Sequence, residues 1–239
     1  MVSTNDEALQ RARSGDPGRL WITAAHQSGG RGRNGRVWTS EPGNLFASLL
    51  LIDPAPPARA AELGFVTSLA LALALRDILG GDPTLKIKWP NDILYDGAKL
   101  AGVLLESVAL PHGLACVAGI GVNCGSHPEG TLYPATDLSS AAGRDIAPHL
   151  VLEALAQAMA QQLDVWLRGP GFAAIRAGWL ALAAGVGAPI RVARTNETIE
   201  GVFETIDAMG RLVLRQPAGE RLIDAGDVFL AAPPLRAHL

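Results

Sequence analysis

The sequence contains few of the residues that mark disulfide-rich, metal-binding or membrane-spanning proteins. Its only cysteines are Cys116 and Cys124, and two cysteines without CxxC spacing indicate neither a disulfide framework nor a zinc or redox centre. We expect both to be buried thiols. The most apolar stretch, residues 63–75, is too short to span a bilayer and predicts a buried helix. The N-terminus lacks the basic segment and apolar run of a signal peptide, so we expect a soluble, cytoplasmic protein.

An excess of charge of one sign is also missing. The 239 residues carry a formal net charge of −3, with an isoelectric point of about 5.9, which argues against a protein that coats nucleic acid through general electrostatics. Apolar residues are abundant, at 49%, and can form a substantial core. The length suits one domain of ordinary size followed by a small second one.

Hydrophobic periodicity and turn residues divide the chain near residue 184. The expected helices span residues 4–13, 59–79, 148–167 and 172–183, and the expected strands of one sheet span residues 19–26, 45–52, 85–89, 99–108 and 114–122. Beyond Gly187 the pattern changes to short strands at residues 189–194, 198–206, 211–216 and 220–229. We predict an α+β fold, with a mixed β-sheet flanked by helices in residues 1–184 and a small β-barrel in residues 185–239.

A loop rich in glycine and arginine, GGRGRNGRVW at residues 29–38, is the first candidate site. Its four glycines let the backbone approach a ligand closely. Arg31, Arg33 and Arg36 offer planar charged groups suited to phosphate or carboxylate, and Trp38 offers a flat apolar surface. The GxxxxGK[ST] spacing of a Walker A loop is absent. Composition alone leaves open a flexible solvated loop or a nucleic-acid contact.

The second candidate site is the segment KIKWPND at residues 86–92. Alternation along a strand places Lys86 and Lys88 on one face, and the strand ends in a turn that presents Asn91 and Asp92 together. A carboxylate beside bound phosphates is where Mg²⁺ is expected, because Mg²⁺ prefers oxygen ligands and shares them with the nucleotide. An ordinary polar turn is the alternative explanation.

Two further strands carry residues suited to a ligand. In KLAGVLLE, residues 99–106, Lys99 opens an apolar strand and Gly102 allows close approach beside it; a solvated lysine at a strand end is the alternative. In GIGVN, residues 119–123, two glycines and the amide of Asn123 end a strand. That ending suits either a ligand or tight backbone packing.

Together and in this order, the four motifs resemble those of the biotin–protein ligase family. That family shows a GRGRxGRxW loop, a KWPND turn, a KLAG(I/V)L(V/L)E strand and a GxGxN strand end, which stand here as GRGRNGRVW, KWPND, KLAGVLLE and GIGVN. Residues 3–5, Ser-Thr-Asn, and His26-Gln27 are similar to the family's biotin-pocket elements. The resemblance covers nearly the whole chain. It implies a class II synthetase-like catalytic domain in residues 1–184 and an SH3-like domain in residues 185–239.

The resemblance also implies roles for individual residues. Biotin is expected to contact Ser3, Thr4, Asn5, Gln27, Gly30, Arg31, Gly32, Arg33, Lys99 and Gly102. ATP and the adenylate are expected to contact Arg31, Arg33, Arg36, Trp38, Lys88, Asn91, Asp92 and Asn123. The expected catalytic residues are Lys99, Arg33 and Arg31, and Asp92 is the expected ligand of Mg²⁺. Because none of these residues follows Ala184, we expect the first 184 residues to form the site almost wholly.

The implied reaction uses ATP, biotin and Mg²⁺. Biotin and ATP form biotinyl-5′-AMP with loss of pyrophosphate, and a lysine of a biotin carboxyl carrier protein or domain then displaces AMP. Cations are needed because the carboxylate of biotin must approach an anionic phosphate, whereas no side-chain nucleophile is required. The loop is expected to order over the intermediate and exclude water. The oligomeric state is left open, with a homodimer as one option.

The chain departs from the family at identifiable places. Only Met1 and Val2 precede Ser3, where the family usually has a strand and an acidic residue, so either the edge of the pocket is frayed or the chain starts late. No winged-helix DNA-binding domain precedes the catalytic part, so we expect no DNA partner. Asn34 stands where many members carry a basic residue, and we expect little effect because the flanking arginines remain.

Two other functions compete with this interpretation. A lipoate–protein ligase shares the fold and the adenylate chemistry, but the GRGRxGRxW and KWPND pair belongs to the biotin ligases. A module that binds RNA or DNA through residues 29–36 is the other, and the acidic isoelectric point and the lack of aromatic residues interleaved in that loop count against it.

Overall fold

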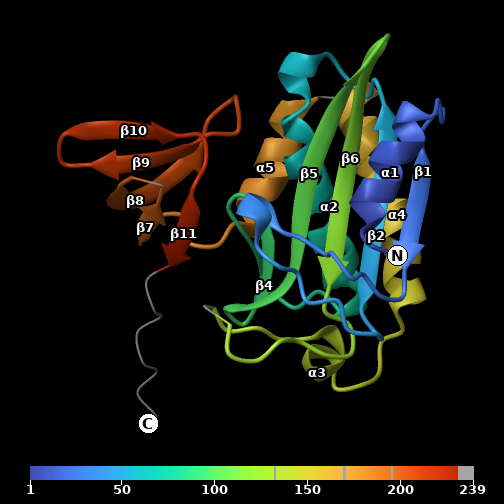
Figure 1. Cartoon of the computed structure of the whole chain (residues 1–239). Helices are drawn as coiled ribbons and strands as arrows, with labels where there is room; N and C mark the ends of the chain where they lie inside the picture. Colours follow the sequence, from blue (N-terminus) through green and yellow to red (C-terminus); the bar gives the residue numbers. More distant parts are fainter. Residues whose placement is uncertain (132, 169–170, 195, 231–239) are drawn as a thin grey trace.

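The computed structural model describes residues 1–131, 133–168, 171–194 and 196–230, which form a sheet-and-helix unit followed by a smaller strand-rich unit (Figure 1). The larger sheet consists of β1 (Leu20–Ala24), β2 (Leu45–Ile52), β3 (Leu85–Lys88), β4 (Asp92–Tyr95), β5 (Ala98–Leu110) and β6 (Gly113–Val122). These strands lie in the order β1-β2-β6-β5-β4-β3, and neighbours pair antiparallel. Isolated parallel bridges, Ile87 to Ala183 and Lys99 to Ala135, make the pairing mixed, as expected.

Helices cover both faces of this sheet. Helix α1 (Thr4–Arg13) packs on one face, and α2 (Glu62–Ile78), α4 (Pro148–Arg168) and α5 (Phe172–Leu182) lie on the other (Figure 1). In β2, Leu49 belongs to the core that includes α2, whereas its neighbour Leu50 packs with Ala8 and Ala12 of α1. Successive strand residues point to opposite faces, so the burial of nearly every residue of β2 indicates a sheet that is covered on both sides.

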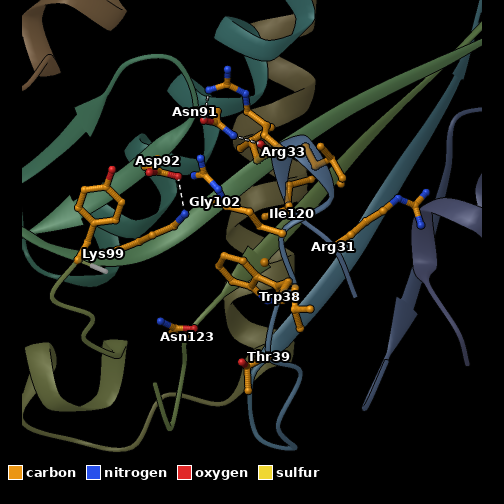
Figure 2. A pocket seen from close by; sticks show the side chains of 18 of the residues that line it. Arg31, Arg33, Trp38, Thr39, Asn91, Asp92, Lys99, Gly102, Ile120 and Asn123 are labelled. Atoms are coloured by element: carbon orange, nitrogen blue, oxygen red, sulfur yellow. Dashed lines mark hydrogen bonds and ion pairs between the residues drawn. The ribbon is translucent and has the colours of Figure 1, made fainter. Parts of the chain in front are cut away.

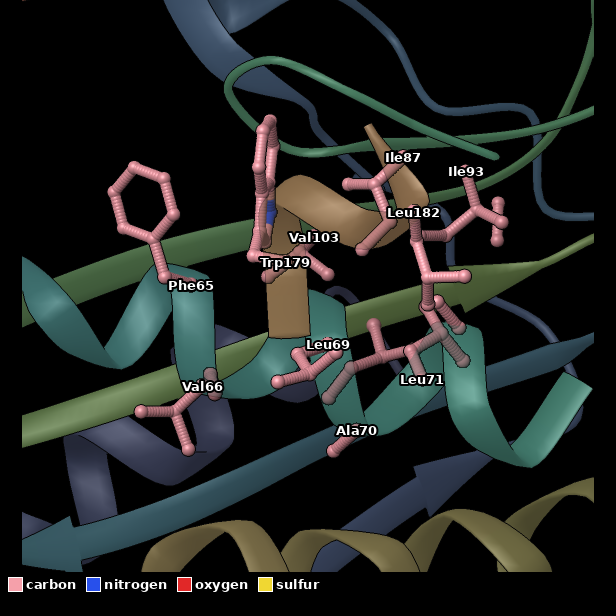
Figure 3. Packing of buried hydrophobic residues seen from close by; sticks show 14 of the residues in the cluster. Phe65, Val66, Leu69, Ala70, Leu71, Ile87, Ile93, Val103, Trp179 and Leu182 are labelled. Atoms are coloured by element: carbon pink, nitrogen blue, oxygen red, sulfur yellow. The ribbon is translucent and has the colours of Figure 1, made fainter. Parts of the chain in front are cut away.

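Helix α2 is central to the larger core and, as predicted, buried (Figure 3). The ring of Phe65 makes an edge contact with Trp179 of α5, with 5.5 Å between ring centroids. The indole nitrogen of Trp179 donates a hydrogen bond to Ser68 Oγ at 3.1 Å, so its polar group is satisfied inside the core. The helix begins later than residue 59, because Pro57–Arg59 forms a separate 3₁₀ turn. No helix in the described ranges has the length and apolar character needed to cross a bilayer.

The smaller unit is an antiparallel sheet formed by β7 (Pro189–Ala193), β8 (Thr198–Ile206), β9 (Leu212–Gln216), β10 (Gly219–Ile223) and β11 (Asp227–Leu230). Its strand order is β10-β9-β8-β7-β11. The single strand predicted at residues 220–229 is wrong: Gly219–Ile223 pairs with β9, and Asp227–Leu230 crosses to the opposite edge to pair with β7. A short stretch of chain must change direction there, and Gly226 lies in it.

Two short elements of the larger unit were not predicted. Residues 92–95, expected as part of a turn region, form β4, which pairs with both β3 and β5. Residues 138–142 form α3, whose first turn is capped by Asp137 through a hydrogen bond from Ser140 N at 2.8 Å. Neither segment is long enough to show a hydrophobic period of its own.

The two units pack against each other through buried and part-buried groups. The indole nitrogen of Trp89, directly after β3, donates to the carbonyl oxygen of Gly210 at 3.3 Å. Arg176 of α5 donates to Thr205 Oγ1 of β8 at 3.1 Å. Gly210 has a φ of +82°, and a Cβ there would lie 2.6 Å from a ring atom of Phe65. A glycine is therefore required where the smaller unit meets α2.

We predict that Gly210→Ala destabilises the protein through this contact. The matched control is Gly187→Ala, because Gly187 has a similar φ of +79° but a Cβ added there would have nothing within 4 Å. The control should lose about 1 kcal/mol from backbone strain alone. Gly210→Ala should lose about 1–3 kcal/mol more from the clash with Phe65. Denaturant unfolding measures both, and equal losses would contradict tight packing between the units.

Candidate active site

A cavity of about 280 Å³ lies where the start of α1, the glycine- and arginine-rich loop, the ends of β3–β6 and the β10–β11 turn converge. The predicted residues that line it are Ser3, Thr4, Asn5, Gln27, Arg31, Gly32, Arg33, Arg36, Trp38, Lys88, Asn91, Asp92, Lys99, Gly102 and Asn123. Segments separated by more than a hundred residues thus meet in one pocket. Of the predicted site residues, Gly30 is the one that does not line it.

Gly30 lies behind the pocket wall. A Cβ at this position would be 2.7 Å from Ser40 Oγ and 2.8 Å from the carbonyl oxygen of Trp38. The carbonyl oxygen of Gly30 accepts a hydrogen bond from Trp38 N at 3.0 Å. Close packing at the base of the loop explains why a glycine stands here, and its contact with biotin stays a prediction.

Short polar side chains form one end of the pocket and hold one another in place. Ser3 caps α1 by accepting a hydrogen bond from Asp6 N at 3.4 Å. Gln27 Oε1 accepts from Thr4 N at 2.8 Å and from Thr4 Oγ1 at 3.1 Å, which fixes the orientation of the Gln27 amide. Asn5 Oδ1 lies 2.6 Å from the buried Ser48 hydroxyl, which donates to it.

A glycine makes room for this polar end. A Cβ at Gly119 would lie 2.3 Å from Asn5 Oδ1, closer than any side chain can approach without displacing Asn5. The first glycine of the GIGVN segment is therefore required for steric reasons, because β6 passes directly beneath the side chain of Asn5. The explanation by tight packing is thus confirmed, and the segment also lines the cavity. Its contact with a ligand stays a prediction.

The glycine- and arginine-rich loop folds back on itself. Gly32 N donates to the carbonyl oxygen of Arg36 at 2.7 Å, and Arg31 forms an isolated antiparallel bridge with Val37. Between them Arg33–Gly35 makes a 3₁₀ turn in which Asn34 has a φ of +57°. Asparagine tolerates this left-handed conformation better than most residues, which is a physical reason for Asn34 at the tip.

Trp38 lies across the strands at the centre of the pocket (Figure 2). A Cβ at Gly121 would be 2.5 Å from its indole ring, and one at Gly102 would be 3.3 Å from it. Two glycines on neighbouring strands thus create the flat surface on which the indole rests. Its Nε1 is buried and has no hydrogen-bond partner among the described residues.

Asp92 holds two lysines at the far end of the pocket. Its Oδ1 lies 2.6 Å from Lys99 Nζ (Figure 2). Its Oδ2 lies 3.2 Å from Lys88 Nζ. Burial by itself raises the pKa of Asp92, but the charges and hydrogen bonds of Lys99 and Lys88 outweigh burial and hold this pKa below its usual value. The ammonium of Lys88 also lies 4.3 Å from the ring centroid of Tyr133. The cluster carries one surplus positive charge.

The three arginines of the loop occupy different environments. Among the described residues, Arg33 makes two long hydrogen bonds, 3.4 Å to Asn91 Oδ1 and 3.4 Å to the carbonyl oxygen of Gly226, and burial lowers its pKa. Arg36 forms an ion pair with Asp227. Arg31 points away from the lysines, as Figure 2 shows, and bonds to carboxylates outside the pocket. Arg33 is therefore the arginine best placed to bind an anion.

The amides of Asn91 and Asn123 are engaged with backbone. Asn91 donates to the carbonyl oxygen of Val103, and Asn123 donates to that of Thr136 at 3.0 Å. Each amide thus uses one of its two N–H donors to fix the strand ends around the cavity. Their contact with a nucleotide stays a prediction.

The smaller unit also contributes to the pocket. Gly226, Asp227 and Val228 line the cavity, and the ring of Tyr133 packs against Phe229 of β11, with 5.3 Å between centroids and the ring planes tilted by 44°. All the other lining residues belong to residues 1–184, so that part forms the pocket almost wholly, as expected, and the smaller unit adds Gly226, Asp227 and Val228. No motif in the sequence marks these residues, because their position depends on how the units pack. Tyr133 was missed for the same reason, since it stands in an irregular segment after β6.

Comparisons with known proteins agree with this arrangement. Residues 3–123 match the model of the biotin/lipoate A/B protein ligase family, and residues 185–231 match the biotin protein ligase C terminal domain. The chain is 43% identical over 237 residues to a biotin–[acetyl-CoA-carboxylase] ligase of Paracoccus denitrificans, covering 95% of this chain and 96% of that protein. It is 31% identical to the bifunctional ligase/repressor of Bacillus subtilis, covering 96% of this chain and 72% of that protein.

A solved structure shows the same fold. The biotin protein ligase of Aquifex aeolicus in complex with biotin and ATP superposes with a TM-score of 0.80 at 25% identity, covering 95% of this chain and 94% of that one. The antiparallel smaller unit is consistent with an SH3-like domain.

We predict that the ion pairs of Asp92 give the protein a pH-dependent share of its stability. Because the pKa of Asp92 is lower in the folded than in the unfolded protein, its contribution is present above about pH 4 and is lost as the pH falls through the folded value. Asp92→Asn should cost about 3 kcal/mol at neutral pH, and this difference from wild type should shrink in acid.

Denaturant unfolding between pH 7 and pH 3 measures that difference. Asp224→Asn is the control, because Asp224 is exposed in the turn before β11, and it should change stability little at any pH. A loss in Asp92→Asn that stays constant down to pH 3 would show that the carboxylate is not coupled to the lysines.

Proposed function

Because the chain belongs to the biotin/lipoate A/B protein ligase family, we propose that it is an ATP-dependent biotin–protein ligase. The observation that carries the proposal is a single pocket with uncharged polar side chains at one end and a surplus of cations at the other. An acid with a neutral polar ring fits such a pocket in one direction only. Its carboxylate lies toward the cations.

The polar end suits the ureido ring of biotin. That ring offers one carbonyl acceptor and two N–H donors, which match short hydroxyl and amide groups. Ser3, Thr4, Asn5 and Gln27 present such groups. The bonds from Thr4 to Gln27 and from Ser48 to Asn5 fix the orientation of both amides before the ligand arrives. A site ordered in advance loses less entropy on binding.

The cationic end suits the first chemical step. The carboxylate oxygen of biotin attacks the α-phosphorus of ATP, the bond to the bridging oxygen breaks, and pyrophosphate leaves. Negative charge builds up on the phosphorus oxygens, where Lys99, Lys88 and Arg33 can stabilise it in a partly buried pocket. The flat face of Trp38 is exposed to the cavity and suits the adenine ring.

The second step transfers biotin to an acceptor. An uncharged lysine amine of the acceptor attacks the carbonyl carbon of the mixed anhydride, and AMP leaves with the bonding electrons. The relative from Paracoccus denitrificans carries the name biotin–[acetyl-CoA-carboxylase] ligase, and we infer that a biotin carboxyl carrier protein or domain supplies the lysine here. The loop over the pocket limits the access of water to the anhydride.

The residues of the pocket do not fit a protein-bound Mg²⁺ ion. Both carboxylate oxygens of Asp92 already face ammonium groups, and the described residues contain no group of three or more His, Cys, Asp or Glu side chains that could hold a metal. We therefore infer that any Mg²⁺ enters as the complex of ATP, held by phosphate oxygens. Asp92 then serves to position lysines.

The remaining assignments follow from the proposed reaction. We propose a cytoplasmic enzyme whose macromolecular partner is the carrier protein, with neither DNA nor a membrane required for the reaction. A homodimer is compatible with this proposal, and sedimentation would establish the oligomeric state.

We predict that the protein catalyses ATP–pyrophosphate exchange that depends on biotin and Mg²⁺. Lipoate should not support the exchange, because it lacks the ureido ring that the fixed amide and hydroxyl groups recognise. The measurement compares exchange with biotin, with lipoate and with neither. Exchange driven equally well by lipoate would contradict the assignment to biotin.

We also predict that Lys99→Met slows adenylation by roughly 10²–10³-fold, the usual cost of removing one charged contact to a transition state. Methionine keeps an unbranched apolar stem and removes the cation. Lys86→Met is the matched control, because Lys86 lies on β3 two residues before Lys88 but does not line the pocket. Single-turnover formation of biotinyl-5′-AMP measures both. If Lys99→Met folds and forms biotinyl-5′-AMP at the wild-type rate, Lys99 does not stabilise the transition state.

A further inference from the structure

Arg31 is bound by two carboxylates and has little capacity left for a phosphate. Its Nη2 lies 2.7 Å from Asp6 Oδ1 and 2.9 Å from Glu106 Oε2, its Nη1 donates to Asp6 Oδ2 at 3.0 Å, and its Nε donates to Glu106 Oε1 at 3.3 Å. A guanidinium has only five N–H donors in a fixed plane. Both forks are therefore occupied, unlike those of Arg33.

The charge balance around Arg31 is opposite to that around the lysines. Asp6 and Glu106 together carry two negative charges against one positive charge, and their hydrogen bonds raise the pKa of Arg31 further above its usual value. An anionic phosphate would be repelled by this cluster. Arg31 was predicted to be a catalytic cation, and its surroundings favour a different role.

Glu106 connects three parts of the chain. It stands on β5, where it pairs with Val117 of β6 in the middle of a long hairpin. Its Oε2 accepts a hydrogen bond from Asn5 Nδ2 at 2.7 Å, in addition to that from Arg31. The carboxylate thus links a rigid hairpin, the polar end of the pocket and the base of the loop.

The base of the loop connects the bond between Glu106 and Arg31 to the rest of the loop. Arg31 forms a bridge with Val37, and Gly32 N donates to the carbonyl oxygen of Arg36 at 2.7 Å, so the two arms of the loop are joined. Trp38 follows directly on the second arm. Holding Arg31 therefore holds both arms, and with them the positions of Arg33 and Trp38.

We propose that Glu106, supported by Asp6, is a positioning residue that clamps Arg31 and so fixes the glycine- and arginine-rich loop over the polar end of the pocket. Arg31 acts as the clamped group and not as a phosphate-binding cation. The kinetic test of this inference rests on the proposed function. The clamp itself is a property of the free protein, and it can be tested without substrate.

Limited trypsin digestion of the ligand-free protein tests the clamp. Trypsin cleaves after arginine, and the loop carries Arg31, Arg33 and Arg36. Glu106→Gln keeps the size of the side chain and removes its charge, so cleavage in the loop should become about tenfold faster, the effect of one charge-assisted hydrogen bond at a part-exposed site. Glu7→Gln is the matched control, because Glu7 lies on α1 beside Asp6 and pairs only with Arg11 in the contacts described. Equal rates in wild type and Glu106→Gln, with mass spectrometry locating the cuts, would overturn the clamp.

Steady-state kinetics then separates positioning from phosphate binding. In Glu106→Gln and in Arg31→Met alike, the KM for biotin and the release of labelled biotinyl-5′-AMP should rise about tenfold, and any rise in the KM for ATP should be the same in both variants, because both loosen the same loop. If Arg31→Met raises the KM for ATP and Glu106→Gln does not, Arg31 binds the phosphates and the proposal is wrong. If wild-type protein shows no biotin-dependent exchange, the proposed function fails, and the digestion still decides whether Glu106 holds the loop.

Discussion

The active site depends on holding mutually repelling cations close together in a partly buried pocket. Lys88 and Lys99 approach the same point from different strands, and in a region of reduced dielectric their repulsion would be large. Asp92 makes the arrangement possible by offering one carboxylate oxygen to each ammonium group. The two positive charges of the lysines are offset by the one negative charge of Asp92, so the pocket keeps a net positive charge that can bind an anion. The same carboxylate explains why Asp92 is poorly suited to bind a metal ion itself.

Space for the ligand is created by glycines on β5 and β6. Gly119 lies beneath Asn5, and Gly121 and Gly102 lie beneath Trp38, at distances where a Cβ would clash or crowd. Because these glycines are on adjacent, regularly paired strands, the floor of the pocket is rigid backbone. The side chains above it belong to α1 and the loop. The pocket thus has a rigid floor formed by β5 and β6 and a wall formed by α1 and the glycine- and arginine-rich loop.

The wall is held by ion pairs at both ends of the loop. Arg31 is bonded to Asp6 and Glu106 in the larger unit, and Arg36 is paired with Asp227 in the smaller one. Between these ends, Arg33 makes two long hydrogen bonds to described residues. Tethered ends with a less constrained centre suit a loop that must close over a reactive anhydride and still exchange substrates. The smaller unit is consequently part of the site and not an appendage.

The sequence by itself determined the helices and most strands, because periodic apolar residues and turn residues are local signals. It also determined which segments carry the chemistry, since GRGRNGRVW, KWPND, KLAG and GIGVN are contiguous motifs. Only the tertiary structure decided that the cations divide into different roles. Arg31 and Arg33 stand two residues apart in one motif, yet one faces Asp6 and Glu106 while the other faces the pocket. It alone also placed Tyr133 and Asp227 at the cavity. Those outcomes depend on partners distant in the chain, and the charge environment of a side chain is set by what folds against it.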